Sequence, residues 1–168
     1  MTILETDRLI ITHLTVKNAP FIFELTNTQE WLQYIGDRGI KNITDAENYI
    51  INGPAASYEK HGHGLYLVTL KDTSAPVGIC GIVKRDTLEH ADIGFALLPE
   101  YTGKGYAHEA ASAVLAYAKE TLGLKKIVAI TLRANLRSVN LLAKLGLVFE
   151  KIVSFPPKEE ELMLFTTV

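Results

Sequence analysis

The segment from Ala91 to Ala107, Ala-Asp-Ile-Gly-Phe-Ala-Leu-Leu-Pro-Glu-Tyr-Thr-Gly-Lys-Gly-Tyr-Ala, constrains the fold more than any other part of the chain. Its apolar run from Ile93 to Leu98 is typical of a buried strand, and Pro99 ends that strand because proline has no N–H group for the ladder. Thr102-Gly103-Lys104-Gly105, called the glycine turn below, predicts a tight turn. A long amphipathic helix is expected next, with Ala107, Ala110, Ala111, Val114, Leu115, Ala118 and Leu122 on one face.

The glycine turn predicts an anion site at the start of this helix. Glycines allow backbone N–H groups to converge on a ligand, and the first N–H groups of a helix have no internal partner and lie at its positive end. A diphosphate is the most natural occupant. A plain strand-to-helix connection is the alternative for an isolated Gly-x-Gly. The motifs of P-loop ATPases and of dinucleotide dehydrogenases are both missing, since His108 stands where the third glycine of Gly-x-Gly-x-x-Gly belongs.

The rest of the chain predicts one α+β (mixed α/β) domain over residues 1–168, with a mostly antiparallel sheet of about seven strands. Strands are expected at 8–14, 65–70, 76–83, 93–98, 126–132, 147–155 and 161–166. Helices are expected at 16–28, 45–53, 54–61, 106–122 and 135–145, with a short helix or a turn at 31–37. Thr44 and Glu47 form a capping-box pattern that starts a helix at Asp45. Gly53-Pro54 is expected to break or kink that helix.

Composition excludes several classes of function. A formal net charge of -2 offers no broad basic surface for nucleic acid or an acidic membrane, so a small molecule or a peptide end is the expected partner. The single Cys80 rules out an internal disulfide and a cysteine metal cluster. It is expected to be a small buried hydrophobe, with a nucleophile as the alternative.

No metal site is predicted, because His61-Gly62-His63-Gly64 is interpreted as a solvated turn. No apolar run approaches the ~20 residues that cross a bilayer, and the N-terminus lacks the pattern of a signal peptide. We therefore expect a cytoplasmic protein. Monomer and homodimer both remain open.

Together these motifs resemble the GNAT superfamily of N-acetyltransferases, and most closely its Rim-type (RimJ/RimL-like) N-terminal acetyltransferase branch. The family's loop pattern is Gln/Arg-x-x-Gly-x-Gly/Ala, and this chain has Glu100-Tyr101-Thr102-Gly103-Lys104-Gly105, which departs only at the first position. Further matching stretches occur in the family's order: residues 5–12, residues 78–82, residues 91–110, Asn135-x-x-Ser138 and Lys144-Leu145-Gly146.

The resemblance implies a site for acetyl-CoA as co-substrate, in a gap where neighbouring strands splay apart. It implies backbone contacts to the pantetheine arm from Phe95, Ala96 and Leu97. It places the diphosphate on Thr102, Gly103, Lys104, Gly105, Tyr106 and Ala107. Asn135 matches the family's coenzyme-contacting asparagine, and it could equally be a plain helix N-cap.

For catalysis the resemblance suggests Ser138 as the acid near the sulfur, with an ordinary first-turn hydroxyl as the alternative. The tyrosine acid of many GNAT enzymes falls at Leu142, which cannot transfer a proton. Asp92 is the expected base, acting directly or through a water molecule, where the family often has a glutamate, and a solvated strand position is the alternative. His90, Glu89 and the run Glu159 to Glu161 are weaker candidates.

These features predict transfer of an acetyl group from acetyl-CoA to a primary amine, by direct attack in a ternary complex. The acceptor is expected to be a protein or peptide N-terminus or a small-molecule amine. The alternative is a non-catalytic module that binds coenzyme A, which the leucine at position 142 favours.

Overall fold

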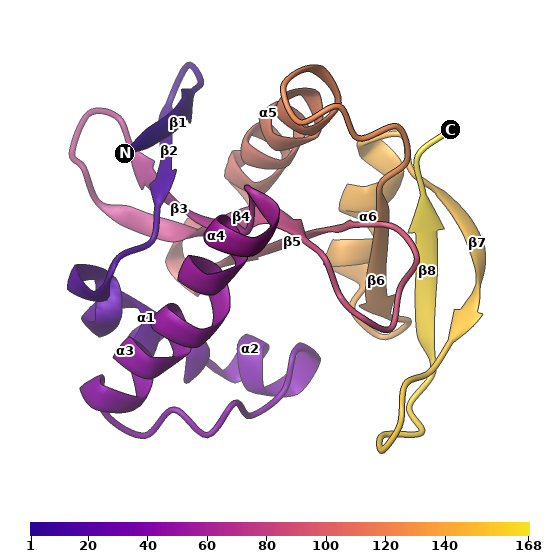
Figure 1. The fold of residues 1–168 in the computed structure, drawn as a ribbon, viewed down its shortest axis with the longest axis horizontal. Coiled ribbons are helices and arrows are strands. Elements are labelled where there is room, and N and C mark those ends of the chain that lie inside the picture. The colour runs from indigo at the N-terminus through magenta and orange to yellow at the C-terminus, as the bar shows by residue number, and fades with distance from the viewer.

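The computed structural model describes all residues from 1 to 168 and has a single sheet of eight strands. The strands are β1 (Thr2–Glu5), β2 (Leu9–His13), β3 (Leu65–Leu70), β4 (Pro76–Val83), β5 (Asp92–Leu97), β6 (Val128–Leu132), β7 (Val148–Val153) and β8 (Leu162–Thr166). Their order in the sheet is β1-β2-β3-β4-β5-β6-β8-β7, and every neighbouring pair is antiparallel except β5 and β6. In Figure 1, β1 and β2 lie toward one end of the molecule and β7 and β8 at the other. The expected α+β fold is confirmed, with β1 as one strand more than expected.

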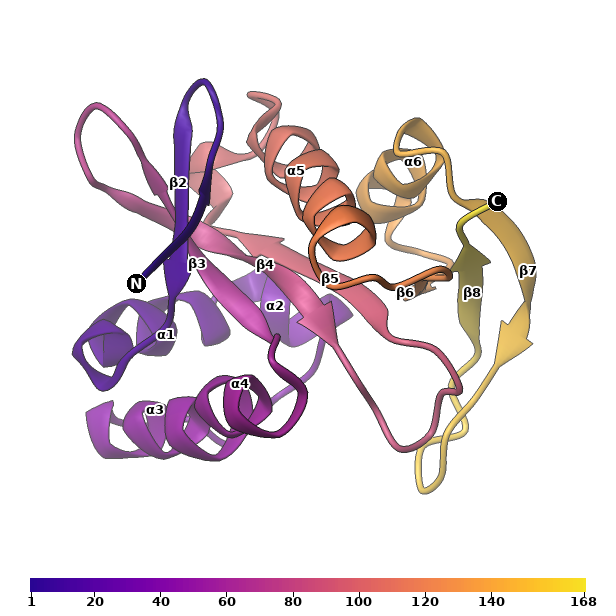
Figure 2. The same ribbon diagram turned by 45° about the horizontal axis from the view of Figure 1, so that its top comes forward.

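Helices cover both faces of this sheet. They are α1 (Ala19–Thr26), α2 (Gln29–Tyr34), α3 (Ile43–Ile50), α4 (Ala56–His61), α5 (Tyr106–Glu120) and α6 (Leu136–Lys144), with short 3-10 turns at Val16–Asn18 and Pro99–Tyr101. Figure 2 shows α5 and α6 on one side of the sheet and α1, α3 and α4 on the other. Three layers result, with the sheet in the middle.

The period-two alternation of the strands divides the apolar side chains between two cores. In β3, Tyr66 and Val68 belong to the core that contains the buried face of α5, whereas Leu67 belongs to the core that contains α1 and α3. Successive strand residues point to opposite faces, so a strand buried on both sides must be apolar at every position. The buried residues of α5, Ala110, Ala111, Val114, Leu115 and Ala118, confirm the predicted helical stripe.

In the α3–α4 region one local prediction is wrong and another holds only in part. The cap of α3 is Asn42, whose side chain accepts a hydrogen bond from the backbone N–H of Asp45 at 2.8 Å, so the helix begins earlier than Asp45. Of the break or kink expected at Gly53-Pro54, the break is absent, although the helix departs from regular α geometry there. Residues Ile51–Ala55 instead form a π-helical turn that connects α3 to α4 without interruption. A wider turn accommodates the proline ring and its missing N–H group.

The parallel pair β5 and β6 is joined at a single position. Asp92 pairs with Val128, and the N–H group of Val128 donates to the carbonyl of Ala91 at 3.0 Å. Beyond this point β5 pairs only with β4, and β6 pairs only with β8. The facing edges of residues 93–97 and 129–132, called the β5–β6 gap below, therefore carry backbone polar groups without a ladder partner.

Candidate active site

A cavity of about 340 Å³ lies beside the end of β5 and the start of α5. It brings together most of the residues that the sequence predicts for a coenzyme site: Phe95, Ala96, Leu97, Thr102, Gly103, Gly105, Tyr106, Ala107, Asn135 and Ser138. Lys104 and Asp92 are the predicted site residues that do not line it. The residues named here come from three separate segments of the chain, which only the fold brings together.

The glycine turn presents a row of free backbone donors to this cavity. Gly103 and Gly105 have φ angles of 77° and 84°, a conformation that side-chain-bearing residues rarely adopt. None of the N–H groups from Gly103 through His108 donates to another backbone group, and the first such bond of α5 runs from Glu109 to Gly105. A Cβ atom at Gly103 would meet nothing within 4 Å, so the turn is open on that side. Free donors at a helix N-terminus are suited to a phosphate or diphosphate.

The start of α6 supplies the polar side chains on the other side of the cavity. The Asn135 side-chain oxygen accepts a hydrogen bond from the backbone N–H of Ser138 at 3.3 Å, so Asn135 is the N-cap of this helix. Both residues also line the cavity. The cap uses the backbone of Ser138 and leaves its hydroxyl group available to a ligand.

Leu142 lies one turn after Ser138 on the same helix face and is buried in the main core, with 1% of its surface exposed. It does not line the cavity, whereas its neighbour Leu141 does. At this position a hydrocarbon side chain contributes packing and no proton. Among the residues of this helix face, Ser138 therefore brings the only hydroxyl group to the cavity.

Asp92 lies at the closed end of the β5–β6 gap and is buried, so the alternative of a solvated strand position does not hold. Its carboxylate accepts a hydrogen bond from the Nε atom of Arg85 at 3.0 Å. Burial raises the pKa of Asp92, and the nearby Arg85 guanidinium only partly opposes that shift. The first β5 residue that lines the cavity is Phe95, three residues after Asp92. At the rise of an extended strand, the two residues are about 10 Å apart.

Replacing Asp92 by asparagine tests this burial through the pH dependence of stability. Because the folded-state pKa is raised above the ordinary value of 3.8, the stabilisation by the protonated form is lost as the pH rises through the folded-state pKa. The unfolding free energy of the wild type should therefore fall relative to that of Asp92→Asn as the pH rises from about 3 toward neutrality. Urea denaturation of both proteins across this range measures it. A difference that stays constant would contradict the raised pKa.

The sequence did not single out the other wall of the cavity, which comes from α1 and α2. Glu30, Trp31, Tyr34 and Ile35, called the α2 wall below, line the cavity together with Leu25 and Thr28. The Glu30 carboxylate and the Arg137 guanidinium, 3.3 Å apart, connect this wall to α6. Trp31 and Tyr34 stand three residues apart after the capping Thr28, a spacing that places both on one helix face and could have revealed this wall.

Two other predictions concern residues away from the cavity. Cys80 is a buried hydrophobe, as expected: only 1% of it is exposed, and burial raises the pKa of its thiol to about 12. His63 is buried rather than solvated, and its Nδ1 atom lies 2.7 Å from the carbonyl oxygen of Ile82. The structure has no cluster of three or more His, Cys, Asp or Glu side chains arranged to hold a metal ion. None of its helices combines the length and apolar character needed to span a bilayer.

Comparison with known proteins decides between the possible uses of such a cavity. Residues 8–148 match the family model described as the acetyltransferase (GNAT) domain. The chain belongs to the GNAT family of acetyltransferases. It is also 32% identical over 146 residues to the "uncharacterized N-acetyltransferase YoaA" of Bacillus subtilis (strain 168), covering 86% of this chain and 81% of that protein. This GNAT protein is accordingly an acetyl-CoA-dependent acyltransferase.

Solved structures show the same fold over the full length of the GNAT chain. An acetyltransferase from Agrobacterium tumefaciens strain C58 superposes with a TM-score of 0.84 at 23% identity, covering 100% of this chain and 94% of the other. The ribosomal L7/L12 α-N-protein acetyltransferase RimL, solved in complex with coenzyme A, superposes with a TM-score of 0.84 at 12% identity, covering 100% and 98%. At these identities the likeness concerns the fold and does not extend to the acceptor.

Proposed function

We propose that this protein transfers an acetyl group from acetyl-CoA to the primary amine of a peptide N-terminus or of a small molecule, by direct attack in a ternary complex. One observation carries the proposal: the free donors of the glycine turn and the open end of the β5–β6 gap border the same cavity. A diphosphate and an extended amide-bearing arm are the two parts of coenzyme A that such groups would bind.

The residues present fit the coenzyme in both parts. The turn from Thr102 to Ala107 would hold the diphosphate with its free backbone N–H groups and the positive end of α5. Phe95, Ala96 and Leu97 would pair with the pantetheine arm through their unladdered edge, as an added strand does. Asn135 would contact the arm from α6 while it caps that helix.

The acceptor would then approach from the α2 wall, which the coenzyme does not need. This wall combines two aromatic side chains, Trp31 and Tyr34, with the carboxylate of Glu30. Aromatic faces and a carboxylate both favour an ammonium group. The Rim-type order of motifs in the sequence supports a peptide N-terminus as the acceptor.

In the reaction, the neutral amine attacks the thioester carbon, a C–N bond forms and the C–S bond breaks. The ammonium group must first lose one proton. As the amide forms, the nitrogen loses a second proton, which balances the proton that the leaving sulfur gains. Ser138 would donate a proton or hydrogen bond to that sulfur, since its hydroxyl borders the cavity one turn before Leu142. The proton of the ammonium group would pass to solvent, because Asp92 does not line the cavity. Holding both reactants together supplies most of the rate, about 7 kcal/mol or more.

A panel of acceptors tests the proposal. Acetyl-CoA would be supplied with peptides that differ in their N-terminal residue, with polyamines and with other small amines, while released thiol is measured and products are identified by mass spectrometry. The same peptides with a blocked N-terminus are the matched control. At least one free amine should gain one acetyl group as thiol appears. If none of the free amines in a panel of this breadth causes thiol release, although coenzyme A still binds, the proposal is contradicted. That result would favour the non-catalytic coenzyme-binding module.

A further inference from the structure

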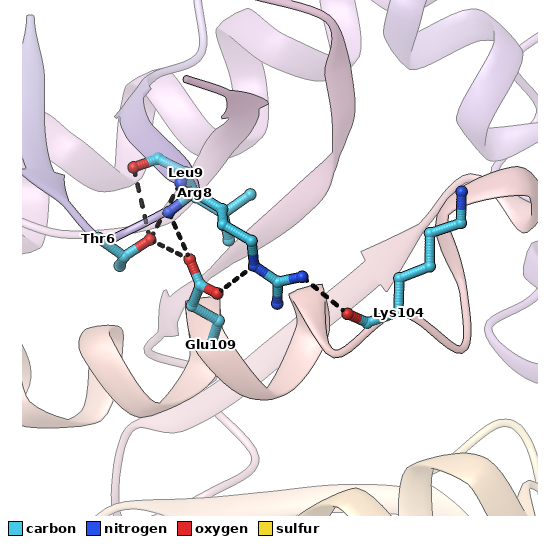
Figure 3. Close-up of polar contacts among 5 residues, drawn as sticks. All are labelled: Thr6, Arg8, Leu9, Lys104 and Glu109. Carbon is cyan, nitrogen blue, oxygen red and sulfur yellow. Dashed lines mark hydrogen bonds and ion pairs between the residues drawn. The ribbon is translucent and has the colours of Figure 1, made fainter. Parts of the chain in front are cut away.

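The connection between β1 and β2 contacts the glycine turn, although the two segments are distant from each other in the sequence. Its residues Thr6 and Arg8 reach the first turn of α5 and the glycine turn (Figure 3). Both residues border a second hollow, which also includes Gly105 and His108. Arg8 does not line the main cavity. It therefore contacts the glycine turn without lining the main cavity.

The carboxylate of Glu109, in the first turn of α5, is fully engaged by this connection. Its Oε2 atom accepts from the Thr6 hydroxyl at 2.5 Å and from the Arg8 backbone N–H at 2.9 Å, and its Oε1 atom accepts from Arg8 Nε at 2.7 Å. Burial acts to raise the pKa of Glu109, but these hydrogen bonds outweigh it and hold the pKa below its usual range. The carboxylate is thus a fixed anchor for the Arg8 guanidinium.

The other end of the guanidinium holds the glycine turn itself. Arg8 Nη1 donates to the backbone carbonyl of Lys104 at 3.0 Å, and the guanidinium lies 4.4 Å from the centre of the Tyr106 ring. Lys104 stands between two glycines with positive φ, where the backbone has more freedom than at other residues. Its neighbouring N–H groups make no backbone hydrogen bond that could fix the turn.

We propose that Arg8 is a positioning residue for the coenzyme: anchored on Glu109, it fixes the Lys104 peptide so that the N–H groups of the glycine turn converge on the diphosphate. This inference rests on the proposed function, because it assumes that coenzyme A binds at the turn. The planar guanidinium is suited to this role, since it can satisfy Glu109 and Lys104 at the same time in one geometry. Lysine has a single ammonium group and cannot reproduce that arrangement.

Three variants of the Arg8–Glu109 cluster, Arg8→Gln, Arg8→Lys and Glu109→Gln, distinguish two roles of Arg8. In one role Arg8 positions the glycine turn, and in the other its charge attracts the phosphates directly. If Arg8 acts by position, each variant loosens the turn and should weaken coenzyme A binding about tenfold, with a larger change in KM for acetyl-CoA than in kcat. If Arg8 acts as a charge, Arg8→Lys should bind as the wild type does. Glu109→Gln should then bind more tightly, because a competing anion has been removed.

Glu5→Gln is the matched control, since Glu5 forms an exposed ion pair with Lys71 next to the same connection and does not contact the glycine turn. Isothermal calorimetry with coenzyme A gives the affinities, and circular dichroism confirms that each variant is folded. The expected result is weak binding by all three cluster variants and wild-type binding by Glu5→Gln. Wild-type affinity for coenzyme A in folded Arg8→Lys or Glu109→Gln would overturn the positioning role of Arg8 but leave the proposed function standing. A wild type that binds no coenzyme A would overturn the proposed function as well.

Discussion

Replacing Gly105 by valine should weaken coenzyme A binding by tenfold or more. A β-branched residue resists the φ angle of 84° found at this position, and the left-handed region costs a side-chain-bearing residue about 1–2 kcal/mol. The turn can relieve that strain only by changing conformation. The backbone N–H groups from Gly103 to His108 would then no longer converge on the diphosphate.

The control for this variant lies at the other end of the same helix. Gly123 has a φ angle of 70°, so Gly123→Val introduces comparable backbone strain away from the cavity. It lacks one feature of Gly105, where an added Cβ would also meet the flexible Arg8 side chain at 3.2 Å. Calorimetry should show wild-type affinity for Gly123→Val and a large loss for Gly105→Val. Equal affinities in the two folded variants would place the diphosphate elsewhere.

Replacing Ser138 by alanine should lower kcat by about a hundredfold and leave coenzyme affinity nearly unchanged. An interaction with the leaving sulfur strengthens only as negative charge develops there, so its loss affects the transition state more than the ground state. The helix cap should survive, because Asn135 accepts its hydrogen bond from the backbone of Ser138 rather than from the hydroxyl.

Ser138→Thr keeps a hydroxyl group and serves as the matched variant for Ser138→Ala. Steady-state kinetics with an acceptor found in the amine panel, with acetyl-CoA saturating, measures both. Turnover by the alanine variant at the wild-type rate would show that Ser138 donates nothing to the sulfur. Catalysis would then depend on positioning and on backbone groups alone.

Local sequence patterns predicted the β5–α5 side of the cavity well. Proline and paired glycines act on the backbone of their own segment, so the strand, glycine turn and helix from Asp92 to Glu120 follow from neighbouring residues. The N-cap at Asn135 is similarly local. Where two local signals competed, one was misjudged: both Asn42 and Thr44 can cap a helix, and only the structure shows that Asn42 does.

The remaining features depend on contacts between distant parts of the chain. Arg8 and Glu109 lie 101 positions apart, and no periodicity within either segment indicates that they meet. The burial of Asp92 depends likewise on how β5 and β6 meet in the sheet, whereas its ion pair with Arg85 spans only seven positions of the chain. The α2 wall faces the cavity because the helices of the N-terminal half cover one side of the sheet. If the acceptor approaches from the α2 wall, as proposed, its specificity is set in the part of the site that one sequence describes least.

Amide NMR spectra of the isotopically labelled protein, recorded during a titration with coenzyme A, test the placement of the coenzyme most directly. Saturable shifts should occur both at the free N–H groups from Gly103 to His108 and along the open edge from Phe95 to Leu97, which the diphosphate and the pantetheine arm would occupy. The amides around Gly123, at the far end of α5, should stay unchanged. Saturable binding that leaves both the glycine turn and the β5 edge unperturbed would contradict a coenzyme site in the β5–β6 gap.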